Sequence, residues 1–292
     1  MSASNRKKLY IGIIAICVFS IIVGLVSEVG LLNGGGKKPN QSSNTTNDGG
    51  TIYNPEPDEF FDEMYNNATT KDDINFDESK FKKMRGAEPL VWEFYFKDVA
   101  NEKFNVVTRI PCINLSVKQD NGENIKEINQ SIQDTFCAIV NKITKGQYSE
   151  NVIYSGDYAG FIYDNQLSLV IRSKMKVGNN TQDMIVKTYN IDLNTLKNLN
   201  LEEELSKRGY SVEKAEGIIK DAIKAKNKYA EDLKSSNLTP YERNVNSDMY
   251  KIENTTEFFI TNKGDLYVVY SYGNSDSQDT TEKDVIKFEA KK

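Results

Sequence analysis

The stretch YAGFIYDNQLSLVIRSKMKV, residues 158–177, holds two runs of β-branched and aromatic residues that meet at Asp164 and Asn165. Runs of this composition favour strands, because such side chains pack well on a pleated surface. Asp and Asn tolerate the positive φ that a two-residue hairpin turn requires. The stretch therefore predicts an antiparallel hairpin, and the run MIVKTYNIDL at 184–193 predicts a third strand after it.

Upstream of this hairpin, the runs LVWEFYF (90–96), FNVVTRIP (104–111) and INLSVKQ (113–119) have the same strand chemistry. Between residues 121 and 144 the apolar residues instead recur every three or four positions, which predicts one amphipathic helix. We expect this helix to pack on the sheet. Its apolar stripe consists of Ile125, Ile128, Ile132, Phe136, Ile139, Val140 and Ile143.

Downstream of the hairpin, residues 201–209 and 211–229 predict two helices. Three closing strands are predicted by FFITNKG (258–264), DLYVVYSY (265–272) and DVIKFEA (284–290). Antiparallel strands with helical insertions form an α+β arrangement. We therefore expect an antiparallel sheet with two main helices packed on it, preceded by one N-terminal transmembrane helix.

That transmembrane helix is predicted by LYIGIIAICVFSIIVGLV, residues 9–26, which holds no charge over eighteen positions. A stretch of this length spans the hydrocarbon core of a bilayer. Because Arg6, Lys7 and Lys8 precede it, the positive-inside rule predicts a cytoplasmic N-terminus and an exported remainder. We expect a single-pass protein of the cell membrane, anchored in the lipid bilayer through residues 9–32.

Two other interpretations of this segment stay open, a cleaved signal peptide and a lipoprotein site at Cys17. The apolar stretch is longer than that of most signal peptides, and no Ala-x-Ala site ends it. Ile16 precedes the cysteine where a lipoprotein site carries a small residue. All three interpretations place the remainder of the chain outside the cytoplasm.

Changes of composition along the chain predict five parts. A stretch rich in Gly, Asn, Ser and Thr is typical of a flexible linker, and an acidic stretch with aromatic residues follows it. The five parts are a cytoplasmic N-terminus (1–8), a transmembrane anchor (9–32), a flexible linker (33–58), an acidic lead-in segment (59–88) and an extracytoplasmic α+β domain (89–292).

The chain of 292 residues has no histidine. Histidine is the commonest general base and the commonest neutral metal ligand near pH 7. Hydrolases built on a histidine base and zinc enzymes with histidine ligands therefore lack an essential group. A formal net charge of −5 does not suit a nucleic-acid backbone. We expect a protein that is not an enzyme, with no cofactor and no nucleic-acid partner.

Of the three cysteines, Cys112 and Cys137 lie in the part predicted to be exported. In an oxidising compartment these two could form a disulfide, since one lies in a predicted strand and the other on the helix that follows. The alternative is a pair of buried free thiols that behave as small hydrophobic side chains. Both alternatives are compatible with the sequence.

Two groups of residues are candidates for binding. Tyr267, Tyr270 and Tyr272 could form an aromatic contact surface, because tyrosine is favoured in surfaces that bind carbohydrate or protein. Ordinary alternation between core and surface is the alternative explanation of these tyrosines. The second group is a set of carboxylates suited to calcium, although their spacing does not match an EF-hand and a solvated charged loop is the favoured explanation. These carboxylates are Asp276, Asp279 and Glu282, with Asp284 beside them.

Five pieces of the chain follow one another in an informative order: RIPCINL, NIKEINQSIQDTF, LSLVIRSKM, KTYNIDLNTLKNLNLEEEL and FFITNKGDLYVVYSYG. In this order they resemble the extracytoplasmic C-terminal domain of RsiV-like anti-sigma factors, which also occurs beside bacterial polysaccharide deacetylases. The resemblance implies an antiparallel sheet with helices on one side and a role in binding at the cell surface, with lysozyme as the ligand of some members. The sequence departs from the family at VGNNTQDM (177–184), where the family has a Gly-Gly-x-His-Gly turn. The resemblance therefore implies a fold and a location, and no activity.

These observations together predict a membrane-anchored binding or sensing module of the bacterial cell envelope. The expected ligand is a cell-wall polymer or a basic extracellular protein, the latter because the net charge is negative. Two alternatives stay open. One is an extracytoplasmic hydrolase that uses two carboxylates, and the other is an envelope scaffold protein.

Overall fold

The structure is a computed structural model in which the described residues belong to one compact unit within Pro55–Lys292. The predicted N-terminus, transmembrane anchor and linker, and the lead-in segment up to residue 87, lie outside the described residues. Among the described residues, no helix is both long enough and apolar enough to cross a membrane. The described residues are 88–115, 123–180, 182–235, 243–271 and 283–289.

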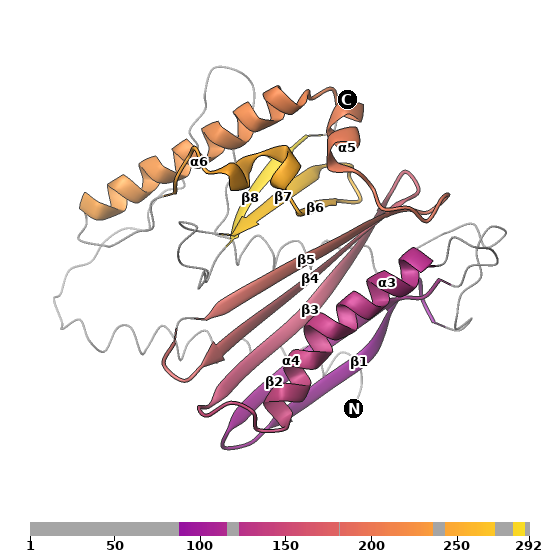
Figure 1. Ribbon diagram of the computed structural model, residues 1–292, viewed down its shortest axis with the longest axis vertical. Coiled ribbons are helices and arrows are strands. Elements are labelled where there is room, and N and C mark those ends of the chain that lie inside the picture. The colour runs from indigo at the N-terminus through magenta and orange to yellow at the C-terminus, as the bar shows by residue number, and fades with distance from the viewer. Residues whose placement is uncertain (1–87, 116–122, 181, 236–242, 272–282, 290–292) are drawn as a thin grey trace, which may run out of the picture. The chain divides into compact units, whose positions relative to one another are not determined.

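A five-stranded sheet forms the first half of the fold (Figure 1), with its strands in the order β1-β2-β3-β4-β5. The hairpin predicted at residues 158–177 is confirmed, because β3 and β4 pair antiparallel around Asp164 and Asn165. Both turn residues have positive φ, 47° and 58°. The strands are β1 (Val91–Ala100), β2 (Phe104–Ile113), β3 (Val152–Tyr163), β4 (Gln166–Val177) and β5 (Asp183–Asp192).

One pair in this sheet is parallel, which corrects the prediction of an antiparallel sheet. β2 and β3 pair parallel from Phe104 opposite Val152 to Thr108 opposite Gly156. The reason is the helical connection between them, since a chain that crosses over through a helix returns in its original direction. That connection consists of α3 (Glu123–Ile132), a π-helical turn (Gln133–Cys137) and α4 (Ala138–Thr144).

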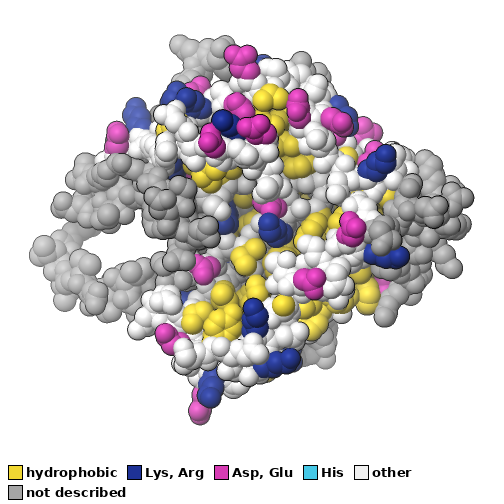
Figure 2. Space-filling model, viewed as in Figure 1, with side chains coloured by type: hydrophobic (Ala, Val, Ile, Leu, Met, Phe, Trp, Pro, Cys, Tyr) yellow, Lys and Arg dark blue, Asp and Glu magenta, His cyan; other side chains and the backbone are white. Residues whose placement is uncertain are grey.

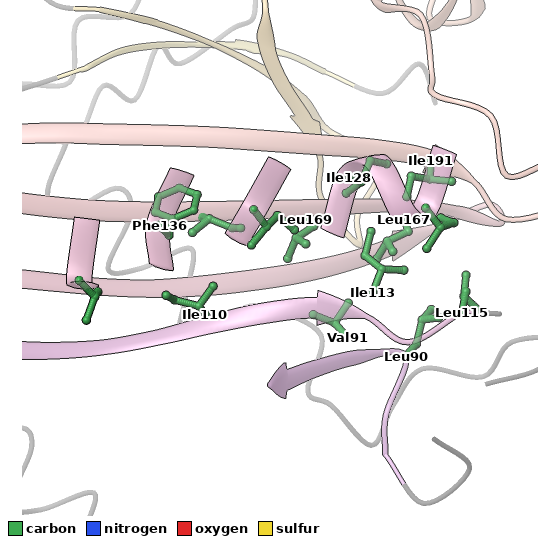
Figure 3. Packing of buried hydrophobic residues seen from close by; sticks show 14 of the residues in the cluster. Leu90, Val91, Ile110, Ile113, Leu115, Ile128, Phe136, Leu167, Leu169 and Ile191 are labelled. Atoms are coloured by element: carbon green, nitrogen blue, oxygen red, sulfur yellow. The ribbon is translucent and has the colours of Figure 1, made fainter. Parts of the chain in front are cut away.

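The helical connection packs its apolar stripe on one face of the five-stranded sheet, as predicted (Figure 3). Asn129 fixes its position, because its side chain accepts a hydrogen bond from the backbone N–H of Ile113 at 2.8 Å and donates one to the carbonyl of the same residue at 3.0 Å. The buried side chains of this core come from the helices and from all five strands of the sheet. They include Ile110, Ile113, Ile128, Phe136, Leu167 and Leu169.

The closing strands form a second sheet rather than extending the first. It has three antiparallel strands, β6 (Glu257–Ile260), β7 (Leu266–Ser271) and β8 (Lys283–Phe288). α5 (Leu201–Lys207) and α6 (Val212–Ser235) contribute their apolar side chains to a second core with this sheet. Each main helical layer therefore has a sheet of its own, whereas the sequence predicted one sheet under both.

The two sheets pack against each other through a third cluster of side chains. Phe161 of β3 and Val186 of β5 meet Phe259 of β6 in it. Hydrogen bonds fix the contact, because the Asn190 side chain donates to the carbonyl of Phe258 at 2.6 Å. The second sheet thus covers part of the face of the first sheet that α3 and α4 leave free.

Candidate functional site

The outer strand β5 is only half covered by the helical layer. Alternation along the strands and the register of β4 and β5 place Ile185, Lys187 and Tyr189 on the same face as Ile171 and other β4 residues. The β4 residues that pair with these three residues on the same face are buried. The three β5 residues themselves keep part of their surface accessible. The cover that α3 and α4 provide therefore ends over β4.

A shallow trough results, with β5 on its floor. Figure 2 shows hydrophobic side chains gathered between the region of α6 above and the region of α3 below, with a few charged side chains among them. We define the trough by Ile185, Lys187 and Tyr189 of β5, Ser131 of α3 and Glu257 of β6. Its residues come from three elements that lie far apart in the sequence.

Tyr189 joins the floor of the trough to the helical wall. Its hydroxyl lies 3.2 Å from the hydroxyl of Ser131. Burial raises the pKa of Tyr189 above the ordinary value of 10.0, and the hydrogen bond between Tyr189 and Ser131 acts in the opposite direction. The phenol is therefore neutral at physiological pH, and its hydroxyl can donate or accept a hydrogen bond.

An ion pair closes the other side of the trough. Lys187 Nζ lies 2.7 Å from Glu257 Oε1, and the Glu257 side chain is 13% exposed against 45% for Lys187. The other carboxylate oxygen, Oε2, accepts hydrogen bonds from the backbone N–H of Thr188 at 2.7 Å and from its hydroxyl at 3.1 Å. Glu257 is thus held in place by three donors, and it presents the ammonium group of Lys187 to the solvent.

This arrangement suits non-covalent binding. An aromatic ring and an aliphatic side chain offer apolar contact, and hydroxyl groups and one ammonium group offer hydrogen bonds, which is the usual composition of a ligand site. Glu257 is committed to positioning Lys187 and the backbone of β5. A general base needs a free oxygen within reach of the proton it removes, so the trough holds no evident candidate for that role.

The two described tyrosines of the predicted aromatic surface, Tyr267 and Tyr270, lie on opposite faces of β7. Tyr270 is 5% exposed, its hydroxyl lies 2.8 Å from that of Thr255, and its ring packs edge-on against Tyr250 with centroids 5.1 Å apart. Tyr267 points to the other face, where it stacks on Phe259 with centroids 5.1 Å apart. Side chains of two different clusters pack on the two faces of β7, so Tyr270 is not available for contact. Tyr272 lies outside the described residues.

The three predicted calcium ligands Asp276, Asp279 and Glu282 also lie outside the described residues. Their neighbour Asp284 is described and is fully buried, with Arg243 Nε 2.7 Å and Lys226 Nζ 3.3 Å from its two oxygens. Its carboxylate serves an internal ion pair. Within the described ranges, no group of three or more Cys, Asp or Glu residues is arranged to hold a metal ion.

Cys112 and Cys137 are both free thiols in the structure. Cys112 is buried at the end of β2, and its Sγ lies 3.6 Å from the carbonyl oxygen of Ile113. Cys137 is half-buried beside the first core, and burial raises the pKa of its thiol to about 11. Of the two alternatives that the sequence left open, the structure has the free thiols.

Lys187 and Tyr189 were not among the residues singled out from the sequence. The run MIVKTYNIDL predicted only a strand, and its alternation does separate Ile185, Lys187 and Tyr189 from the residues between them. Alternation along the strand separates its two faces, but it does not show which face lies under the helices. How much of β5 the helices cover depends on how far α3 and α4 reach across the sheet, and local sequence does not encode this.

No family model and no curated protein matches the sequence. The structure is similar to two crystal structures of DUF3298 family proteins, each with a TM-score of 0.39. The one from Bacteroides fragilis is 14% identical, and the match covers 63% of this chain and 81% of that protein. The one from Pseudomonas aeruginosa PAO1 is 13% identical, with 68% and 87% covered.

Structural similarity at this low level concerns only the path of the backbone. Neither the family of this protein nor its function follows from it.

Proposed function

We propose that the protein is a membrane-anchored binding module of the bacterial cell envelope and that the trough is its contact surface. One observation carries this proposal, the half-accessible row of Ile185, Lys187 and Tyr189 beside a fixed carboxylate. Apolar and aromatic side chains that stay accessible next to oriented polar groups are typical of ligand sites. The anchor, the export of the domain and the RsiV-like resemblance are the sequence-based part of the proposal.

The chemistry of the trough favours a ligand with both an apolar surface and polar groups. The ring of Tyr189 suits the face of a sugar or an apolar side chain, and Lys187 suits a carboxylate or phosphate on the same molecule. A cell-wall polymer combines these features. We therefore place wall polymers before extracellular proteins as the expected ligand.

Binding is preferred over hydrolysis for two reasons. The chain has no histidine that could act as a base. In addition, a glycosidase needs two carboxylates opposed across the scissile bond, and the carboxylate in the trough is held by Lys187 and Thr188.

A retention assay with the full-length chain in membrane vesicles tests the proposal. The probes are insoluble peptidoglycan, a phosphodiester wall polymer and lysozyme. We expect retention by one of the wall preparations and a loss of about tenfold in the double variant Lys187→Glu with Tyr189→Ala, which is the size expected for residues central to a contact. The matched control Lys224→Glu changes the same charge at an exposed position of α6 and should have no effect.

Two results would count against the proposal. One is a chain that ignores all three probes, and the other is a double variant that binds as well as the unsubstituted protein. The variant Tyr189→Phe separates folding from recognition, because it keeps the ring that packs beside α3 and removes only the hydroxyl.

Protease added to intact cells tests the location of the domain, since an exported domain is digested and a cytoplasmic one is protected.

A further inference from the structure

The trough ends where the outer edge of β5 meets the second sheet at Glu257. This residue lies on the face of the second sheet that packs toward the first, because Phe259, two positions later on β6, belongs to the cluster between the sheets. Lys187 reaches the carboxylate from the trough, with its Nζ 2.7 Å from Oε1. This ion pair therefore joins the trough to the junction of the two sheets.

A second lysine, Lys283 of β8, lies on the same face of the second sheet. Val285, two positions later, packs on the cluster between the sheets, so alternation places the Lys283 side chain on that side. The register pairs Glu257 with Val269 and Val269 with Val285. Lys283 is thus two strands and two residues away from Glu257, a Cα separation of about 12 Å. The long side chains of lysine and glutamate bring the two charges much closer than this.

Lys283 has few polar partners for a half-buried cation. Its Nζ donates to the Ser271 hydroxyl at 3.4 Å, a long hydrogen bond to a neutral group. No ion pair between described residues includes it. Burial lowers the pKa of Lys283 below its ordinary value of 10.5, while Glu257 and Asp183 act in the opposite direction. An ammonium group has three donors, and a buried donor is stabilised by each acceptor it finds.

The acidic groups nearby are committed to other partners. Glu257 accepts hydrogen bonds from Lys187 and from the backbone and hydroxyl of Thr188. Asp183 has an interaction of its own. Lys187 gives one donor to Glu257, and 45% of its side chain is exposed. Two ammonium groups therefore approach one carboxylate that three donors already hold, and both keep donors for an incoming anion.

The pair of lysines favours phosphate over carboxylate as this anion. A planar carboxylate is matched best by the two parallel donors of arginine, whereas lysine acts as a point charge and commonly binds phosphate. A phosphodiester has two non-bridging oxygens, one for each ammonium group. On β5, Lys187 stands between Ile185 and Tyr189 on the floor of the trough, so the part of the ligand beside the phosphate meets apolar and aromatic side chains.

We propose that Lys187 and Lys283 together bind a phosphodiester group and that the ligand of the trough is a polymer with phosphodiester links. This inference rests on the proposed function, in which the trough is the contact surface, and it adds the chemical class of the ligand. The phosphate lies between the two ammonium groups at the outer edge of β5, and an uncharged part of the polymer lies on the ring of Tyr189.

Retention of the full-length chain in membrane vesicles on immobilised poly(glycerol phosphate) tests the proposal. The comparison probe is peptidoglycan from which phosphodiester polymers have been removed, and it should retain the chain less strongly. Lys283→Gln should weaken retention on poly(glycerol phosphate) about tenfold, the size expected for a lost hydrogen bond to a charged group. Lys283→Arg keeps the charge and should preserve most of the retention. The control Lys224→Gln removes an exposed charge of α6 and should have no effect.

Salt dependence separates an ionic contact from an effect on folding. Retention on poly(glycerol phosphate) should fall with added salt, and the slope of log affinity against log salt concentration should be shallower by about one in Lys283→Gln, as for other phosphodiester polymers. Retention that is insensitive to salt and to Lys283→Gln would overturn the proposal.

The same assay distinguishes this inference from the proposed function. Retention only on phosphate-free peptidoglycan, or only on lysozyme, would overturn the phosphodiester assignment and leave the trough as the contact surface. A chain that poly(glycerol phosphate), peptidoglycan and lysozyme all fail to retain would overturn both.

Discussion

The two halves of the fold cover their sheets with helices in different ways. The core between α3, α4 and the five-stranded sheet is built from aliphatic and aromatic side chains. The half around the three-stranded sheet also has an apolar core. However, all four buried charged residues of the described part lie in this second half or where it meets β4. These residues are Glu204, Arg208, Arg243 and Asp284.

This difference implies two kinds of sensitivity. An apolar core loses stability in proportion to the volume removed from it. A buried ion pair contributes little net stability while it is intact, because desolvation offsets the attraction, yet removal of one partner leaves a buried charge uncompensated. In the first half, substitutions that conserve side-chain volume should therefore cost little stability. In the second half, replacing both residues of a buried ion pair with apolar residues should cost less stability than replacing one of them.

The largest effect is expected at Asp284. Arg243 donates to it at 2.7 Å, and Asn227 holds the backbone of Arg243 through two hydrogen bonds of 2.7 and 2.8 Å. Arg243→Met leaves the carboxylate with Lys226 as its partner and should lower the free energy of unfolding by about 4 kcal/mol, measured by urea denaturation. Arg243→Met with Asp284→Leu should recover part of this loss.

An exposed pair provides the control for this prediction. Lys224 and Asp221 lie 3.0 Å apart on α6 with most of both side chains in solvent. Lys224→Met should change the stability by no more than about 0.5 kcal/mol. If the Arg243 variant lost no more than this control, burial would not distinguish the two ion pairs and the contrast between the halves would fail.

The next largest effect is expected in the apolar half. Leu169 of β4 is fully buried in the first core. Leu169→Ala should cost about 3 kcal/mol through lost burial and the cavity that remains, measured in the same urea experiment. Leu169→Met keeps the volume and should cost less than about 1.5 kcal/mol. Equal losses in the two variants would mean that volume does not govern this core.

Local patterns explain which parts of the fold were predictable. The turn at Asp164 and Asn165 and the apolar stripe from Ile125 to Ile143 depend on residues close in the sequence, and both are present as predicted. The parallel pairing of β2 with β3 and the division into two sheets depend on contacts between distant residues. Periodicity identifies a strand and its two faces, but it does not identify the neighbouring strand.

The candidate sites show the same limit. Tyr270 was predicted on a contact surface because alternation cannot show that both faces of β7 are covered. Asp284 was placed in a charged loop, but Arg243, which lies 41 residues earlier, draws it into an internal ion pair. The trough could not be predicted either, since it exists because the helical layer stops over β4 while β5 continues beyond it.

A smaller effect, visible only in acid, is expected at Glu204. Burial raises the pKa of Glu204, but hydrogen bonds from Lys207 and Arg208 outweigh it, so the pKa lies below the ordinary value of 4.5. A folded-state pKa below the unfolded one adds stability that is complete above the unfolded pKa and is lost as the pH falls through the folded pKa.

The variant Glu204→Gln isolates this contribution. Its thermal midpoint should lie below that of the unsubstituted chain at pH 7, and the difference should shrink as the pH is lowered from 5 toward 3. Gln166, which donates to Glu204 at 2.8 Å, keeps a partner in the variant, so the change reports on charge. A difference between the two midpoints that stayed constant over this pH range would show that Glu204 contributes no pH-dependent stability.

The smallest effect is expected at the hairpin that joins β3 and β4. Asn165 has a φ of 58°, in the left-handed region that alanine adopts at a cost of about 1 kcal/mol. Asn165→Ala should therefore lower the free energy of unfolding by about that amount, whereas Asn165→Gly should be nearly neutral, because glycine adopts this conformation without strain. Equal stability of the two variants would mean that the turn relaxes and that its φ does not fix the register. The register of this hairpin matters because β3 carries the exposed Ile153 and β4 pairs with the trough strand β5. A slip of one residue would turn the side chains of the slipped strand to the opposite face of the sheet.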